Sequence, residues 1–199
     1  MPAGFRAIVV DNGSTDGTAE VARRAGATVV VEVMPGYGAA VDAGVRAASA
    51  PYVAVLDGDG SMDPRSLPTL LSDIRDGSVT MAVGRRRPTD RGVWPWHARA
   101  GTAVLAWLIR RRTGLMIHDL APMRVCRRDD LVTLDVLDRR FGYPLELMVK
   151  AARAGWTVRE SDVAYGRRAS GTRSKVSGSV RGTALTVVDF AGVLRGARR

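Results

Sequence analysis

Short runs of apolar and β-branched residues alternate along the first half of the chain with longer segments of helical composition. We expect strands over residues 5–10, 27–33, 52–56 and 79–83. We expect helices over residues 15–25, 39–50 and 64–75. Such alternation is typical of an α/β fold with a mostly parallel central sheet flanked by helices. Ligands of these sheets bind where strands end, which is where Asp11 and Asp57 stand.

The second half of the chain has a less regular pattern. We expect a strongly basic helix over residues 94–112, a helix over 144–154, a strand near 156–158 and an apolar helix over 184–194. Residues 119–125 form an apolar stretch that begins with an acid, and residues 163–182 are rich in Arg, Gly and Ser. No apolar run approaches the roughly 18 residues of a membrane span. No signal peptide precedes the first strand-like run, so we expect a cytoplasmic protein.

Composition excludes several kinds of site. A single cysteine, Cys126, cannot form an intramolecular disulfide or a Cys-rich zinc site, and two histidines are too few for a His-based metal cluster. The aromatic content of 6% and the absence of a stacking motif argue against a nucleic-acid-binding protein.

The net charge of +10 is unevenly distributed. Residues 1–80 hold 6 basic and 10 acidic residues (6 − 10 = −4), and residues 81–199 hold 24 and 10 (24 − 10 = +14). The clustering favours a C-terminal half that meets an anion, which is a phosphate, an anionic membrane face or a nucleic acid; the alternative is a solvated basic surface. Of the 30 basic residues 28 are arginines, which suit bidentate phosphate contacts.

An acidic turn, Asp57-Gly58-Asp59, follows the third expected strand. Two carboxylates separated by one residue at a strand end can share a hard divalent cation, Mg²⁺ or Mn²⁺. Such a cation bridges a diphosphate and acts as a Lewis acid on it as a leaving group. The alternative is an ordinary polar loop. Asp63 is near enough to assist, or it caps the next helix.

The order of motifs resembles the family 2 glycosyltransferases, whose fold is the GT-A fold of nucleotide-diphospho-sugar transferases. Four segments carry the resemblance: Val9-Val10-Asp11-Asn12-Gly13-Ser14-Thr15-Asp16-Gly17-Thr18, Pro35-Gly36-Tyr37-Gly38, residues 56–64 around the acidic turn, and Gly84-Arg85-Arg86. Three later segments are similar to the dolichyl- or polyprenyl-phosphate sugar synthases: Asp119-Leu120-Ala121-Pro122-Met123-Arg124, Glu146 with residues 150–155, and Ser174-Lys175-Val176-Ser177-Gly178.

The resemblance implies one glycosyltransferase domain over residues 1–199, with a nucleotide-sugar-binding half (1–84) and an acceptor-binding half (85–199). It implies an inverting hexosyltransferase that uses a GDP- or UDP-sugar and a polyprenyl phosphate at the membrane face, with possible peripheral attachment to an anionic membrane. The implied nucleotide-sugar contacts are Asp11, Asn12, Ser14, Gly36, Tyr37, Gly38, Asp57, Gly58 and Asp59, and the implied metal ligands are Asp57 and Asp59. The implied acceptor-phosphate contacts are Arg99, Arg124, Ser174 and Lys175. Alternatively, Arg99 belongs to a solvated helix face and Arg124 forms an ion pair with Asp119.

The nature of the acceptor decides whether a base is needed. A sugar hydroxyl requires a carboxylate base, for which Asp119 is the first candidate and Glu146 the second. A phosphate monoester, whose second pKa is about 6, is mostly dianionic at neutral pH and needs none. The charge distribution favours the phosphate, so Asp119 is either a base or an organiser.

Some features depart from the family pattern. Family members usually begin with one more strand and an acidic loop that hold the nucleotide base, whereas Met1 directly precedes what resembles their second strand. We expect a late start site or a shortened, poorly active chain. Asn12 replaces a more usual acid, and Tyr37 stands where many members have Lys. The alternatives are transfer to a non-lipid acceptor, a nucleotidyltransferase, and an inactive member that acts as a partner protein.

Overall fold

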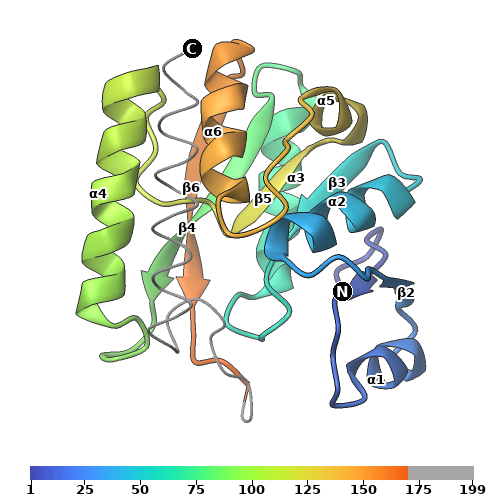
Figure 1. Ribbon diagram of the computed structural model, residues 1–199. Helices are drawn as coiled ribbons and strands as arrows, with labels where there is room; N and C mark the ends of the chain where they lie inside the picture. Colours follow the sequence, from blue (N-terminus) through green and yellow to red (C-terminus); the bar gives the residue numbers. More distant parts are fainter. Residues whose placement is uncertain (170–199) are drawn as a thin grey trace.

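The computed structural model describes residues 1–169; Ser174, Lys175 and the apolar helix expected over residues 184–194 lie outside the described part. The strands are β1 (Ile8–Asp11), β2 (Thr28–Val31), β3 (Tyr52–Val55), β4 (Met81–Pro88), β5 (Met123–Arg127) and β6 (Val158–Tyr165). The helices are α1 (Thr18–Arg24), α2 (Tyr37–Ala47), α3 (Leu67–Arg75, after a 3₁₀ turn over Pro64–Ser66), α4 (Trp96–Thr113), α5 (Arg128–Thr133) and α6 (Tyr143–Arg153). This alternation confirms the expected α/β class (Figure 1).

Two sheets make up the described structure. The larger sheet has the order β3-β5-β4-β6, and β1 and β2 form a separate parallel pair. β4 and β6 are parallel, but β5 runs antiparallel to both of its neighbours, β3 and β4. β3, β4 and β6 therefore run in the same direction, as the predicted mostly parallel sheet requires, and β5 is inserted in the opposite direction. Apolar periodicity reports which residues are buried, and it carries no information on strand direction.

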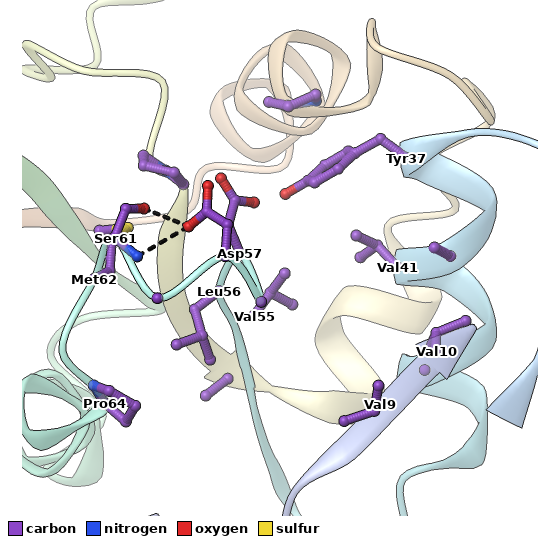
Figure 2. A pocket seen from close by; sticks show the side chains of 18 of the residues that line it. Val9, Val10, Tyr37, Val41, Val55, Leu56, Asp57, Ser61, Met62 and Pro64 are labelled. Atoms are coloured by element: carbon purple, nitrogen blue, oxygen red, sulfur yellow. Dashed lines mark hydrogen bonds between the residues drawn. The ribbon is translucent and has the colours of Figure 1, made fainter. Parts of the chain in front are cut away.

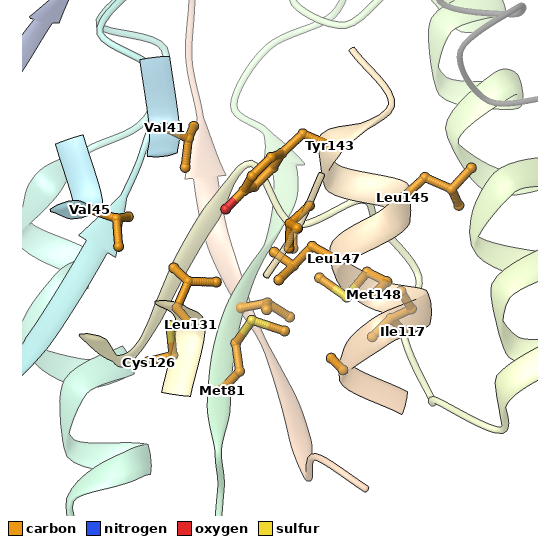
Figure 3. Packing of buried hydrophobic residues seen from close by; sticks show 14 of the residues in the cluster. Val41, Val45, Met81, Ile117, Cys126, Leu131, Tyr143, Leu145, Leu147 and Met148 are labelled. Carbon is orange, nitrogen blue, oxygen red and sulfur yellow. The ribbon is translucent and has the colours of Figure 1, made fainter. Parts of the chain in front are cut away.

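The larger sheet lies between two helical layers, as Figure 1 shows. Alternate side chains of β4 enter opposite layers: Met81 and Val83 pack with α2, α5 and α6, and Ala82 packs with α3. Figure 3 shows the first of these clusters, in which Leu147 and Met148 of α6 approach the sheet. Each fully buried side chain of this size contributes roughly 1.5–3 kcal/mol to folding. Packing on both faces makes the sheet a rigid base for the loops at its ends.

A wide cavity separates the two sheets. Its volume is 3020 Å³, and β1, β3 and α2 line it together with the turn that follows β3. Within residues 1–169, β1 pairs only with β2, and β3 pairs only with β5. α2 joins the two sides, because Gly44 packs closely on Val10 of β1. No helix in this part of the chain is both long and apolar enough to cross a membrane.

Candidate functional site

The acidic turn after β3 opens into the wide cavity. Asp57, Gly58 and Asp59 all line it. One oxygen of Asp59 accepts hydrogen bonds from the backbone N–H of Ser61 at 3.0 Å and from its hydroxyl at 2.6 Å, which Figure 2 marks with dashed lines. The other oxygen pairs with Nε of Arg168 at 2.6 Å. Within residues 1–169 Asp57 has no such contacts, and its carboxylate faces the hydroxyl of Tyr37 across the cavity (Figure 2).

The two carboxylates differ in their electrostatic environment. Burial raises the pKa of Asp57, and the neighbouring charge of Asp59 raises it further. Burial also acts to raise the pKa of Asp59, but hydrogen bonds from Ser61 and the Arg168 guanidinium outweigh it, so that pKa is lowered. The neighbouring carboxylates of Asp57 and Asp59, of which Asp59 is held ionised, make this part of the cavity negatively charged. A cation placed between them would relieve their repulsion.

The donor set fits a hard divalent cation. Asp57 and Asp59 offer only oxygen atoms, which Mg²⁺ and Mn²⁺ prefer. No group of three or more His, Cys, Asp or Glu residues with metal-binding geometry exists among residues 1–169. The protein would thus supply two carboxylates and leave other coordination positions to phosphate oxygens and water. Metal binding by Asp57 and Asp59 stays a prediction.

A strap after β6, residues 166–169, closes on the acidic turn. The backbone N–H of Gly166 donates to the carbonyl of Ser61, and that of Ala169 donates to the carbonyl of Asp59, both at 2.8 Å. These bonds bring Arg168 to Asp59 and place a positive charge at the edge of the negatively charged part of the cavity. The sequence prediction did not include Ser61 or Arg168. A serine two residues after an aspartate indicates a local turn and was a usable signal for Ser61.

The end of β1 presents a second group of predicted residues. Asp11 accepts a hydrogen bond from the backbone N–H of Ser14 at 2.9 Å, and this bond lowers the pKa of Asp11. The Asn12 amide donates to the carbonyls of Glu32 and Met34 and accepts from the N–H of Gly36. Asn12 and Ser14 line the wide cavity, but the side chain of Asn12 is fully used in holding the loop after β2. A direct nucleotide contact by these residues stays a prediction.

The glycine-rich turn before α2 packs against another backbone segment. A Cβ atom at Gly36 would lie 2.1 Å from the carbonyl oxygen of Arg139, and one at Gly38 would lie 2.1 Å from that of Asp138. The N–H of Gly38 donates to the carbonyl of Arg140. These contacts explain both glycines by close packing. Because both glycines face the backbone of residues 138–140, their orientation does not support the predicted contact with a nucleotide sugar.

Arg124 is buried beneath the site and does not face solvent. It is 1% exposed, and its guanidinium donates to the Tyr37 hydroxyl at 2.8 Å and to the carbonyl of Ala121 at 3.2 Å. The rings of Tyr37 and Tyr143 cover it. Burial of this kind disagrees with the predicted contact between Arg124 and an acceptor phosphate. The alternative ion pair with Asp119 is also wrong, because Asp119 binds Arg86.

Asp119 and Arg86 form a buried, two-pronged ion pair. Nη2 and Nε of Arg86 donate to the two carboxylate oxygens at 2.6 and 2.9 Å, and the backbone N–H groups of Arg86 and Leu120 donate as well. Glu160 of β6 fixes the neighbouring backbone by accepting from the N–H groups of His118 and Asp119. Since both oxygens of Asp119 are occupied, the geometry fits an organiser better than a base. The sequence prediction did not assign Arg86 or Glu160 to the site.

A second cavity of about 280 Å³ lies beside this ion pair, and five arginines line it. Its basic lining residues are Arg85, Arg86, Arg87, Arg99, Arg110 and His118. Asp119 is the acid that lines it, and Asp162 pairs with Arg85 and Arg87 at its rim. In the described chain no carboxylate pairs with Arg99 or Arg110. Arg86 and Trp94, which stack at 4.0 Å, line both cavities and so connect them.

Glu146 lies away from both cavities. Its carboxylate accepts from the backbone N–H groups of Leu137 and Asp138, and Lys150 pairs with it at 3.2 Å. It therefore stabilises the turn before α6, and the structure does not bring it to the site as a second candidate base. Of the two predicted acceptor-phosphate contacts that the structure describes, Arg99 lines the basic cavity and Arg124 does not.

Comparisons with known proteins agree with this geometry. The sequence model described as "Glycosyl transferase family 2" matches residues 2–131. The chain belongs to glycosyl transferase family 2. A protein of Mycobacterium tuberculosis named an uncharacterized glycosyltransferase is 58% identical over 190 residues, which are 96% of this chain and 86% of that protein. The dolichyl-phosphate hexose transferase of Haloferax volcanii is 33% identical over 167 residues, which are 83% of this chain and 72% of the relative. The resemblance predicted from the motifs is confirmed.

Solved structures establish the fold of this family 2 member. Glucosyl-3-phosphoglycerate synthase from M. tuberculosis, in complex with Mn²⁺, UDP-glucose and glycerol 3-phosphate, superposes with a TM-score of 0.73. The alignment covers 96% of this chain and 68% of the synthase at 22% sequence identity. The predicted GT-A fold is thereby confirmed.

Proposed function

We propose that this glycosyltransferase moves a hexose from a nucleotide-diphosphate sugar to a polyprenyl phosphate with inversion at the sugar carbon. The observation that carries the proposal is that the acidic turn of the wide cavity lies next to a cavity lined by arginines. The acidic turn lies in the wide cavity, the arginine-lined cavity lies beside it, and Arg86 lines both. The dolichyl-phosphate hexose transferase among the relatives supports an acceptor of this class.

On the donor side, Asp57 and Asp59 would hold Mg²⁺ or Mn²⁺. A bound cation of this kind neutralises the charge that develops on a departing nucleoside diphosphate. Ser61 and Arg168 keep Asp59 ionised and fixed in position, and Tyr37 faces Asp57 from the opposite side. The complex of glucosyl-3-phosphoglycerate synthase with Mn²⁺ and UDP-glucose supports a donor and metal of this type. We assign residues 1–84 to the donor half and residues 85–199 to the acceptor half of one domain.

On the acceptor side, Arg86 and Arg99 would bind the phosphate. A phosphate monoester is mostly dianionic at neutral pH, so its oxygen can attack the sugar carbon without losing a proton to the protein. Asp119 then acts by aligning Arg86, and its occupied oxygens suit that task. The cavity of 280 Å³ has room for a phosphate group, while an isoprenoid chain would extend out of it.

The test is sugar transfer by the purified full chain. GDP- and UDP-sugars are supplied with undecaprenyl phosphate and Mn²⁺ or Mg²⁺, and the lipid product is identified by mass spectrometry. We expect a sugar-phosphate lipid that disappears with EDTA and with Asp59→Ala. Undecaprenol, which lacks the phosphate, is the matched control and should accept no sugar. Transfer to 3-phosphoglycerate in place of the lipid, or transfer to undecaprenol, would contradict the assigned acceptor.

A further inference from the structure

The outward face of α4 carries an exposed apolar stripe. Trp96 is 81% exposed and Trp107 50%, whereas Val104, which is 57% exposed, lines the wide cavity. Ala100 and Ala103 lie between the two tryptophans and are exposed as well. The positions 96, 100, 103, 107 and 111 follow one another at helical spacing, so they share one side of the helix. Ala106 and Ile109 of α4 are fully buried, and other sides of the helix line the two cavities.

The charge around this stripe has a single sign. α4 contains four arginines and no acidic residue. Arg99, Arg111 and Arg112 are exposed, and the guanidinium of Arg111 lies 5.7 Å from the centre of the Trp107 ring. Tryptophan is enriched at membrane–water interfaces, and clustered arginines attract anionic headgroups. Helices that lie in the plane of a membrane combine an apolar face of this kind with a basic one.

Other exposed apolar residues have a different setting. Val31 and Val33 are 63% and 91% exposed, but Glu32 stands between them and they belong to the acidic half of the chain. Val21 follows Glu20 on α1. No tryptophan stands next to these valines in the sequence, and the two arginines near Val21, Arg23 and Arg24, pair with Glu20. Among these exposed apolar sites, α4 is the one whose arginines would complement an anionic surface.

The position of α4 connects the stripe to the acceptor cavity. Arg99, Thr102 and Arg110 line the basic cavity from the neighbouring side of the same helix, and Ala103 belongs to both faces. We propose that α4 docks on an anionic phospholipid membrane, with Trp96 and Trp107 in the interfacial layer and the exposed arginines against headgroup phosphates. The acceptor phosphate then enters the basic cavity from the membrane surface while its hydrocarbon chain stays in the bilayer. The entry of the acceptor phosphate from the membrane rests on the proposed function. The docking of α4 on a membrane does not depend on it.

Binding to lipid vesicles tests the docking without any sugar donor. The full chain is sedimented with vesicles of phosphatidylcholine alone or with 30 mol% phosphatidylglycerol, a composition of our choice. We expect binding to the anionic vesicles, a blue shift of tryptophan fluorescence, and quenching by brominated acyl chains. The double variant Trp96→Ala/Trp107→Ala should bind at least roughly tenfold more weakly, because interfacial affinity scales with buried apolar area. Arg111→Gln/Arg112→Gln should weaken binding to anionic vesicles roughly tenfold to thirtyfold.

Two comparison variants separate docking from general effects. Trp96→Phe/Trp107→Phe keeps the apolar stripe and should retain most of the affinity. Val31→Ala/Val33→Ala removes equally exposed apolar groups from β2 and the loop after it, and should bind as the wild type does. Circular dichroism and thermal unfolding establish that each variant is folded.

Three outcomes would overturn the proposal. The first is no binding of the wild type to anionic vesicles, including the case in which residues outside the described part cover α4. The second is unchanged binding by the tryptophan-to-alanine variant. The third is a dimer in sedimentation velocity that this variant abolishes while vesicles bind neither protein, since a second copy would then occupy the face. Vesicle binding without transfer to any polyprenyl phosphate would reject the proposed function and leave the docking intact. Transfer to a detergent-solubilised acceptor without vesicle binding would reject the docking and leave the proposed function intact.

Discussion

Arg86 is the residue at which the acidic and basic parts of the site meet. Its guanidinium is held by Asp119 on one side and by the rings of Trp94 and Tyr165 on others. The Asp119 side chain is 1% exposed and that of Arg86 17%, so water competes little for this pair. Removing one partner of a buried pair leaves an uncompensated charge, which is the costly event.

We predict that Asp119→Ala lowers the free energy of unfolding by about 3 kcal/mol. Arg86 would lose both carboxylate bonds and would keep its charge in a poorly solvated position. Urea denaturation followed by circular dichroism measures the loss. Asp162→Ala is the control, because the Arg87–Asp162 pair is about half exposed on both sides and such pairs contribute less than about 1 kcal/mol. Equal losses in the two variants would show that burial of the Asp119 pair has no energetic consequence.

Cys126 is predicted to be inert in the folded protein. It is buried against the core, and burial raises the pKa of its thiol to about 12. Relative to an unfolded thiol of pKa about 8.5, the thiolate fraction at mildly alkaline pH falls roughly a thousandfold. We expect iodoacetamide at pH 8.5 to label the urea-unfolded chain rapidly and the native chain almost not at all, as measured by mass spectrometry. Because the folded pKa is the higher one, this thiol stabilises the fold fully below about pH 8.5, and the stabilisation is lost as the pH rises toward about 12. Native labelling at the unfolded rate would refute the burial.

At the scale of elements, two helical glycines should respond oppositely to the same change. A Cβ at Gly38 of α2 would lie 2.1 Å from the Asp138 carbonyl and 2.9 Å from Cα of Arg139, and neither backbone atom can move alone. At Gly101 of α4 a Cβ meets nothing within 4 Å. We predict that Gly38→Ala destabilises by more than about 2 kcal/mol, whereas Gly101→Ala stabilises by up to about 1 kcal/mol. Thermal unfolding of the two variants measures both effects. A Gly38→Ala variant as stable as the wild type would mean that the close contact with residues 138–140 is dispensable.

The elements that the sequence predicted best are those whose signal is local. The apolar runs located β1, β2 and β3, and the basic helix over residues 94–112 corresponds to α4. β4 continues to Pro88, past the predicted end at Gly84, because the arginines that follow pair along β6. That pairing, like the antiparallel insertion of β5, depends on distant segments. A local pattern contains neither.

The same division holds for the site. Asp57 and Asp59 could be located because a single turn brings them together. Arg168 is brought to Asp59 by the β4–β6 pairing and by the strap that follows β6. No short sequence motif could therefore predict the contact between these two residues. Gly36 and Gly38 show the opposite problem, since a glycine-rich turn has the same sequence whether it approaches a ligand or a backbone. Arg124 was assigned to the acceptor phosphate by resemblance, and a sequence motif does not reveal that this arginine is buried.

At the scale of the whole molecule, the charge distribution matches the two parts of the site. Residues 1–80 carry a net charge of −4 and contain the acidic turn, whereas residues 81–199 carry +14 and contain the basic cavity. A donor bound by the first half would therefore require a cation, and an acceptor phosphate bound by the second half would not. The two binding events should consequently differ in their dependence on a divalent metal.

We predict that UDP or GDP stabilises the protein against heat only together with Mn²⁺ or Mg²⁺. A ligand at a hundred times its Kd adds about 2.7 kcal/mol of stability, which corresponds to a rise in Tm of about 5–10 °C for a chain of this length. Asp59→Asn should abolish the metal-dependent part of the rise, because it removes a carboxylate that would neutralise the cation. Asp162→Asn, on β6 and away from the acidic turn, should retain it. Inorganic phosphate, in contrast, should stabilise through the basic cavity with or without metal, and Arg99→Gln should weaken that effect alone. A metal-dependent rise that survives in Asp59→Asn would place the cation elsewhere and would remove the acidic turn from the donor site.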